Sequence, residues 1–318
     1  MMKKQLLLCF LIMNCTFFVP KCFAQADISM ATHWYNRANY NPASIARNDY
    51  IYLFSNVQKQ WLGVNGSPAV FNVQASGYNY KLNSAFGISL VSDQLGLTQV
   101  LNPMLTYAYR INYKSDLSLS MGISAGVFSR TIDGSQFEPS TVNDLALYSN
   151  LETTILPDAN IGVELQSSHF VLGVASTHLF SIIKTDNTFL NSNHLYSYAI
   201  YKNTNSEIMN YNFGLQMSAA NNVAIMEGNA SVRFKHASGL TTGPREIFDL
   251  GISYRSSKQL VLLFGLNVSS NFRIGYAFDQ SFTVGYNANS THEIMLEYRI
   301  PSKAASICNC RNEGNWYY

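Results

Sequence analysis

The sequence predicts an all-β protein, an antiparallel transmembrane β-barrel of about 14 strands that follows a cleaved signal peptide. Three observations support this prediction. The N-terminus has the pattern of an export leader. Charged residues make up 13% of the 318-residue chain, about half of the usual share in a soluble domain. Apolar and polar side chains alternate in segments of about nine to eleven residues, the length that a tilted strand needs to cross a bilayer.

The leader comprises residues 1–24, with cleavage as far as residue 26. Lys3–Lys4 form a basic start, the apolar run Leu6–Val19 follows, and small residues mark the cleavage site. The run is too short to span a bilayer comfortably, which favours removal. Cys22 would suggest a lipoprotein, but the proline and lysine directly before it do not suit a lipobox.

Without the leader, the chain carries 18 Lys+Arg, because three of its 21 are removed, against 19 Asp+Glu. A nearly neutral chain excludes an electrostatic footprint for nucleic acid. Cys308 and Cys310 remain, and they lie too close in sequence for a relaxed disulfide. Their role stays open.

Period-two alternation gives most segments one apolar and one polar face. In 117–128 the apolar face carries Leu, Met, Ile and Val, and the other face carries Ser and Gly. Segments 105–111, 161–166, 272–279 and 293–300 repeat the pattern. A soluble β-sandwich would also alternate, but the long segments and the small residues of the polar face favour a lumen surrounded by outer-membrane lipid.

The expected barrel occupies residues 48–300, between an N-terminal periplasmic segment, 25–47, and a C-terminal tail, 301–318. Its strands are expected near 48–60, 69–79, 84–91, 101–111, 117–130, 158–166, 169–176, 195–203, 208–218, 227–235, 247–256, 259–268, 272–279 and 292–300. An even number places both termini in the periplasm and the long connections 131–157, 178–194 and 280–291 outside the cell. Connections 236–246 and 257–258 fit poorly, which suggests one misassigned strand in the second half.

The predicted lumen face carries charges of both signs. Two interpretations are open: charge pairs that fill the interior, or a selectivity ring in an open pore. Pairing is favoured because neither sign dominates. The residues are Arg110, Glu164, Arg233, Arg255, Arg273, Asp279, Glu293, Glu297 and Arg299.

Patterns that could carry chemistry lack the context that the chemistry requires. Gly122–Gly126 matches the G-x-S-x-G nucleophile elbow, but its serine lies in the middle of a predicted strand. His292-Glu293 begins like a zinc-protease motif, but position 296 is leucine. The six histidines show no metal-ligand spacing. We therefore expect no catalytic residue, no cofactor and no metal.

Several short strings, in order, resemble the PorP/SprF family of type IX secretion proteins over roughly residues 33–300. The opening Asn-Pro-Ala signature, the first-hairpin motif, an Asp-x-x-Gly loop and the final Ser-His-Glu-Ile strand have counterparts here. The matching strings are Tyr40-Asn41-Pro42-Ala43, Gln60-Trp61-Leu62-Gly63-Val64-Asn65-Gly66-Ser67-Pro68, Ser92-Asp93-Gln94-Leu95-Gly96, Tyr107–Ile111, Gly251–Arg255, Ile274–Asp279 and Thr291-His292-Glu293-Ile294-Met295-Leu296. Ser67 replaces the family's usual alanine, and the tail 301–318 does not match closely.

The resemblance implies a non-enzymatic outer-membrane component of the type IX secretion and gliding machinery. Such a protein scaffolds the periplasmic ring and peptidoglycan-associated components, or assists secretion or surface attachment of specific cargo with a C-terminal signal. A passive porin and a barrel-type hydrolase are the alternatives. Family-motif residues that could contact a partner are Asn41, Pro42, Trp61, Gly63, Gly66, Pro68, Asp93, Gly96, His292 and Glu293.

We expect partners at the loops and termini, because loops carry contacts more often than strands do. The segment 131–157 is expected to fold back as a plug of the lumen or to meet cargo. The segment 25–46 and the tail 301–318 are expected to contact the periplasmic machinery.

Overall fold

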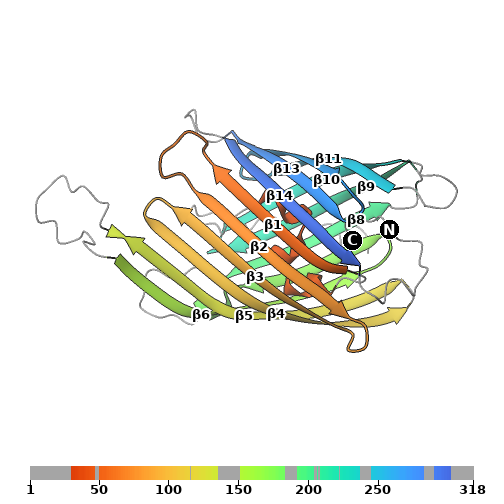
Figure 1. Cartoon of the computed structure of the whole chain (residues 1–318), viewed down its shortest axis with the longest axis horizontal. Coiled ribbons are helices and arrows are strands. Elements are labelled where there is room, and N and C mark those ends of the chain that lie inside the picture. Colours follow the sequence, from red (N-terminus) through yellow and green to blue (C-terminus); the bar gives the residue numbers. More distant parts are fainter. Residues whose placement is uncertain are drawn as a thin grey trace, which may run out of the picture.

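The computed structural model describes residues 30–46, 50–114, 116–134, 151–182, 192–203, 206, 208–221, 223–236, 245–282 and 290–301. Fourteen antiparallel strands form one closed barrel, in which β1 lies beside β14 (Figure 1). The expected architecture is confirmed. The strands are β1 (Tyr50–Gln60), β2 (Ala69–Asn79), β3 (Ser84–Leu95), β4 (Thr98–Lys114), β5 (Leu117–Asp133), β6 (Leu151–Gln166), β7 (Phe170–Thr177), β8 (His194–Asn203), β9 (Met209–Ala220), β10 (Val223–His236), β11 (Arg245–Arg255), β12 (Gln259–Asn267), β13 (Phe272–Ser281) and β14 (Ser290–Pro301).

The alternation seen in the sequence separates an outer and an inner face. In β4, Leu105 is 68% exposed on the outside, whereas Ala108 is completely buried on the inside. Closure between β1 and β14 runs without interruption from Tyr50↔Pro301 to Gln60↔Thr291. The closed ladder pairs the backbone groups within the wall, and the apolar side chains face outward, as is typical of barrels that span a membrane.

Short 3-10 helices are the remaining regular elements of the described residues. They are η2 (Ala31–Trp34), η3 (Arg37–Asn39), η4 (Pro42–Ile45) and η6 (Leu179–Ile182). None of the helices in the described ranges is long and apolar enough to cross a membrane.

The two ends of the barrel differ. Because the strand count is even, β1 begins and β14 ends at the same end, which we call the terminal end. The turns 80–83, 167–169 and 268–271 lie there, and the connections 61–68, 96–97 and 256–258 lie at the opposite end. The expectation of a misassigned strand in the second half was wrong, because β10, β11 and β12 all pair in sequence order. Residues 237–244 lie outside the described ranges.

The hairpin of β5 and β6 is longer than the sequence indicated. Paired residues extend to Asp133↔Leu151, so both ends of the expected connection 131–157 are strand. Its centre, 135–150, lies outside the described residues, so the expected fold-back stays a prediction. Figure 1 shows this hairpin projecting past the neighbouring strands at the opposite end.

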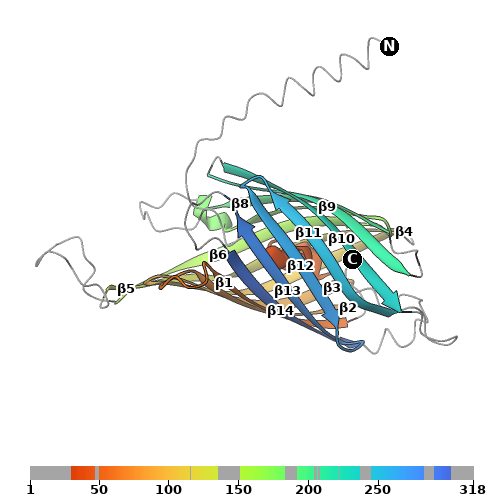
Figure 2. The ribbon, with the colours of Figure 1, turned by 90° about the horizontal axis from the view of Figure 1, so that it is seen from above.

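The lumen is filled by the N-terminal segment. Residues 30–46, expected in the periplasm, lie inside the barrel, with Ala31, Thr32 and Asn41 completely buried. Figure 2 shows this segment enclosed by the strands. The correction has a physical reason: the inner face is lined by polar and small side chains, and the segment supplies the groups that pair with them.

Candidate functional site

The candidate site is the plug, which we define as residues 30–46. Two asparagines shape it, because the side chain of Asn36 accepts a hydrogen bond from Ala38 N and that of Asn41 from Ala43 N. Each starts a 3-10 turn, and Pro42 occupies the first turn of η4, where its missing N–H costs nothing. The Asn-Pro-Ala string therefore encodes a tight turn inside the lumen.

Inward-facing glycines make room for these turns. Gly122 of β5 and Gly162 of β6 are cross-strand partners, so they form a single depression in the wall. A Cβ at Gly122 would overlap the backbone of Pro42 and Ala43, and a Cβ at Gly162 would overlap the side chain of Asn41. The first glycine of the apparent nucleophile elbow thus serves plug packing.

A buried ion pair holds the centre of the plug. Arg37 donates to both oxygens of Glu164, from Nε at 2.9 Å and from Nη2 at 3.2 Å, and the two side chains are 1% and 4% exposed. Tyr198 donates to the same carboxylate and accepts from Asn41 Nδ2 at 2.8 Å. Burial is the largest influence on Arg37 and disfavours its charge, but Glu164, Tyr198 and Tyr40 together raise the pKa of Arg37 above its ordinary value. The guanidinium is therefore permanently charged.

Glu293 of β14 anchors the start of the plug. Its carboxylate accepts hydrogen bonds from Ala31 N at 2.6 Å and Thr32 N at 3.1 Å, and from Gln58 Nε2 of β1 at 2.7 Å. Amides at the start of a helical turn lack an intrahelical acceptor, and a carboxylate there is favourable. One side chain thus joins the plug to both strands of the closure.

A second group of anchors lies on the wall of β10, β11 and β13. Trp34 Nε1 donates to Glu227 at 2.6 Å, and Tyr35 Oη donates to Asp249 at 2.8 Å. Each of these carboxylates is also paired with an arginine of the wall: Arg255 lies 2.7 Å from Glu227, and Arg273 contacts Asp249. The plug therefore adds hydrogen bonds to carboxylates whose charges the arginines of the wall already balance.

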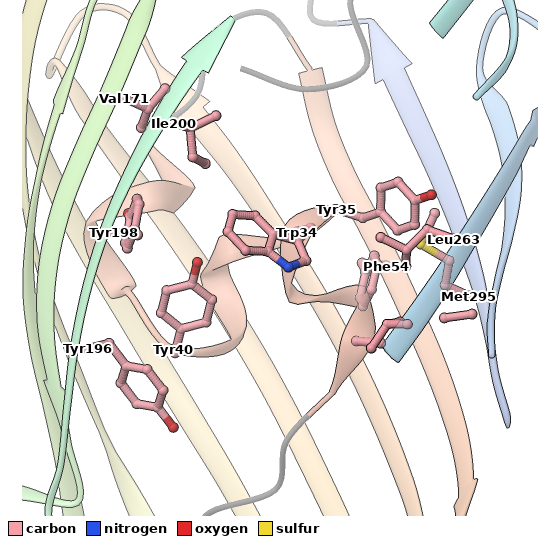
Figure 3. Packing of buried hydrophobic residues seen from close by; sticks show 13 residues of the cluster. Trp34, Tyr35, Tyr40, Phe54, Val171, Tyr196, Tyr198, Ile200, Leu263 and Met295 are labelled. Atoms are coloured by element: carbon pink, nitrogen blue, oxygen red, sulfur yellow. The ribbon is translucent and has the colours of Figure 1, made fainter. Parts of the chain in front are cut away.

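Aromatic packing fills the space between these polar anchors. Figure 3 shows Trp34, Tyr35 and Tyr40 of the plug between two walls, one with Tyr196 and Tyr198 and the other with Leu263 and Met295. The ring centroids of Tyr40 and Tyr196 are 5.1 Å apart. Buried aromatic pairs add to the energy of area burial.

His33 is the plug residue whose ordinary pKa lies closest to neutral pH. Burial lowers its pKa, although Glu227, with Oε2 3.7 Å from the ring Nε2, acts in the opposite direction. The docked plug therefore favours neutral His33.

Five of the predicted lumen charges form buried ion pairs, as expected: Glu164, Arg255, Arg273, Asp279 and Glu297. Arg255 bridges Glu227 and Asp279, and Arg273 bridges Asp249 and Glu297. Buried charges require such partners. Of the nine residues listed from the sequence, all but the half-buried Arg110 are buried. Arg110 donates to the plug at Ala46 O, at 3.2 Å.

The predicted family-motif residues fall into three places. Asn41, Pro42 and Glu293 meet in the lumen as plug and anchor. His292 is half-buried and its Nδ1 lies 2.7 Å from Tyr276 Oη, away from the plug. The others belong to β3 or to connections of the opposite end. They are Trp61, Gly63, Gly66, Pro68, Asp93 and Gly96.

The two motif loops at the opposite end are neighbours. Gly96 N donates to Gly66 O at 3.0 Å, so the first-hairpin motif and the Asp-x-x-Gly loop form one surface. Gly63, Gly66 and Gly96 have φ values of +94°, +71° and +57°, a region that glycine adopts without strain. Trp61, with φ of +47°, is 42% exposed at the end of β1.

The apparent catalytic serine is a structural residue of β5. Ser124 is 5% exposed and its Oγ lies 2.8 Å from Thr106 Oγ1 of β4. It lies within an unbroken strand, without the strand-to-helix turn of a nucleophile elbow. Within the described ranges, no three His, Cys, Asp or Glu side chains are placed to hold a metal ion.

Sequence reasoning missed the plug residues Trp34, Tyr35 and Arg37, and their partners Glu227 and Asp249. The sequence signal that could have located the plug was the number of glycines on the inner face. At Gly122, Gly162 and Gly214 the wall has no side chain, so another segment must fill the space inside it. A Cβ at Gly214 would overlap the Trp34 ring.

Comparisons with known proteins agree with this architecture. The CymD monoaromatic hydrocarbon channel has a TM-score of 0.50 at 10% identity, covering 88% of this chain and 95% of that chain. The TodX deltaS2S3 mutant monoaromatic hydrocarbon channel also has a TM-score of 0.50, at 12% identity, covering 84% and 94%. These likenesses show the fold alone. No curated protein matches the sequence.

The family assignment rests on a match over most of the chain. The model of the family described as "Type IX secretion system membrane protein PorP/SprF" matches residues 22–298. The matched range contains the plug and nearly the whole barrel. This chain is therefore an outer-membrane member of the PorP/SprF family of type IX secretion system proteins.

Proposed function

We propose that this protein is a non-enzymatic scaffold or accessory of type IX secretion whose barrel is closed by its own plug. It acts through surfaces at its two ends, to hold periplasmic components or to assist secretion or surface attachment of specific cargo. The observation that carries the proposal is the plug. Its polar contacts reach β1, β2, β4, β6, β8, β10, β11 and β14.

A passive porin needs a continuous aqueous path, and the plug supports the opposite arrangement. Arg37, Trp34 and Glu293 lie across the lumen in contacts of 2.6–3.2 Å. Separating Arg37 from Glu164 would leave the buried carboxylate without its counter-charge, which is strongly unfavourable. The competing function is a passive porin. Conductance of the purified protein in planar bilayers tests it: we expect closed traces, and stable open channels would support the porin.

The surface at the opposite end is the proposed site for cargo. Trp61 and the glycines at 63, 66 and 96 form one connected loop surface there, together with Pro68 and Asp93. On a barrel with periplasmic termini, this surface faces the outside of the cell. Its residues have a folding role as well, so substitutions must be judged against barrel assembly.

The tail is the proposed contact for the periplasmic machinery. It directly follows β14 at the terminal end, and the N-terminal segment 30–46 is committed to the lumen. Deleting 302–318 should weaken co-purification with periplasmic components and leave the barrel assembled. If the deletion abolishes assembly while partners still bind, the tail is an assembly signal instead.

Gene deletion tests the proposed function as a whole. We expect loss of a subset of secreted or surface-attached proteins with a C-terminal signal, without loss of solute uptake. Normal cargo combined with reduced uptake would reject the scaffold in favour of the porin. The matched control for expression is a variant that keeps the plug and carries a substitution at an exposed position, such as Lys81→Met in the turn after β2.

A further inference from the structure

The long strand β6 has an unpaired edge. It pairs with β5 along its whole length, from Asp133↔Leu151 to Ser118↔Gln166. It pairs with β7 only from Ile161 to Gln166. Residues 151–160 therefore continue past the last β7 partner, in the hairpin that Figure 1 shows projecting at the opposite end.

Two hydrogen bonds show to which side the backbone N–H and C=O groups of each β6 residue point. Ser167 N donates to Phe170 O across the tight turn, so odd-numbered residues of β6 direct their backbone groups toward β7. Asp133 N donates to Leu97 O, so odd-numbered residues of β5 face β4 and even-numbered ones face β6. The β5–β6 register has no bulge. Both bonds therefore agree that the N–H and C=O groups of Thr153 and Ile155 point to the unpaired side.

Pro157 fits the same assignment. It lies on the odd-numbered side of the strand, where its missing N–H removes no bond to β5. Proline within a sheet is confined to edges and to positions outside the ladder. Between residues 153 and 157, the unpaired side thus presents the N–H groups of Thr153 and Ile155 as donors. It presents the C=O groups of Thr153, Ile155 and Pro157 as acceptors.

The turn before helix η6 contacts β6 at residues 158–160, next to residues 153–157. His178, directly before it, donates from N to Asn160 Oδ1 at 2.9 Å and places Nδ1 2.7 Å from Asp158 Oδ2. Asp158 is buried on the inner face, so this contact lies on the lumen side of the strand. In the part of the chain that the structure describes, no backbone hydrogen bond reaches Thr153 or Ile155 from the β7 side.

We propose that this edge, residues 153–157, binds an extended strand of a secreted partner protein by β-addition. Donors and acceptors that repeat every second residue match the backbone of an extended strand. A helix cannot pair with them, because its own backbone groups are bonded within the helix. Ile155, 64% exposed beside the edge, adds an apolar contact for the side chains of the incoming strand. Long open edges are normally blocked in monomeric proteins because they template pairing. The inference rests on the proposed function, since that places this end outside the cell.

The first test is residue-resolved hydrogen exchange of the purified barrel. Amides of Thr153 and Ile155 should exchange at nearly unprotected rates, whereas Thr154 and Leu156, bonded to β5, should be protected by at least 100-fold. Equal protection at all four positions would mean that the chain covers its own edge, and this would overturn the proposal.

The second test is photo-crosslinking in cells with p-benzoylphenylalanine at Ile155. Val163, on the same outer face of β6 but beside the paired stretch, is the control position. We expect a product with a secreted protein at position 155 only. Adding Thr153→Pro should reduce it at least tenfold and leave the β5 ladder intact, as Pro157 does.

The outcomes separate this inference from the proposed function. An undiminished product in Thr153→Pro, or a product only with a second copy of this chain, overturns β-addition of a partner. If gene deletion abolishes cargo attachment but Thr153→Pro does not, the edge is wrong and the proposed function stands. If deletion leaves all cargo unaffected, both fail.

Discussion

Replacing Arg37 by methionine tests whether the buried ion pair holds the plug. The substitution keeps most of the side-chain volume but removes the guanidinium that donates at 2.9 and 3.2 Å to Glu164. The carboxylate, 4% exposed, then keeps Tyr198 as a donor but loses its counter-charge. We expect the plug to undock far more often.

The size of the effect follows from the cost of an uncompensated buried charge. Breaking a buried pair by removing one partner costs about 3–5 kcal/mol. Since about 1.4 kcal/mol corresponds to a factor of ten in an equilibrium constant, the undocked fraction should rise roughly 100-fold to 4,000-fold. Arg37→Met with Glu164→Gln should lose less than Arg37→Met alone, because no charge is then left unpaired.

Hydrogen exchange of plug amides measures this population directly. Ala31 N, bonded to Glu293, and Ala43 N, bonded to Asn41, report on the two ends of the plug. Lys81→Met serves as the control for removing a positive charge at an exposed site. Exchange at both amides within threefold of the parent in Arg37→Met, in a protein that still forms a barrel, would refute the anchoring role of the pair.

Further predictions follow from the same structure. Because the docked plug favours neutral His33, docking should be strongest above the ordinary histidine pKa of about 6.5 and should weaken as the pH falls from there toward the lowered pKa of the docked residue. Hydrogen exchange of Ala31 N at pH 7.5 and 5.5, corrected for intrinsic rates, measures this change. The substitution His33→Gln should remove the pH dependence. Gly122→Val should expel the plug and produce bilayer conductance, whereas Gly228→Ala, whose Cβ would meet only Leu215 at 3.7 Å, should stay closed. Gly66→Ala, at a φ of +71°, should destabilise the loop at the opposite end by about 1 kcal/mol, seen as faster proteolysis there, with heat-modifiable migration of the barrel unchanged.

The strands could be predicted because each one lies between lipid and lumen. That placement forces the period-two pattern, so the segment expected at 292–300 became β14 (Ser290–Pro301) with its faces as assigned. The β5–β6 hairpin was underestimated for the same reason. Residues 151–157 continue past the last partner in β7, and residues 131–133 are all half-buried, so the apolar and polar separation that alternation reveals is weaker at this end of the hairpin.

The plug could not be located from the sequence because its turns have no period. Residues 31–45 form three 3-10 turns, in which buried positions follow one another without spacing. Alternation identifies the face of a wall residue but not what it contacts, so Gly162 was assigned to a lumen rather than to Asn41. Glu293 was noticed as a motif residue that could contact a partner, but its role as the plug anchor in the lumen needed the structure.

The position of Glu293 has a consequence for the timing of assembly. Its contact with Ala31 joins residues 262 positions apart, and the same carboxylate bonds Gln58 across the seam where the first and last strands meet. The plug precedes every barrel strand in the sequence but acquires this anchor only when the final strand is in register. Long-range contacts of this kind form late in folding. A docked plug therefore indicates that the barrel has closed, because its Glu293 anchor exists only once β14 is paired with β1.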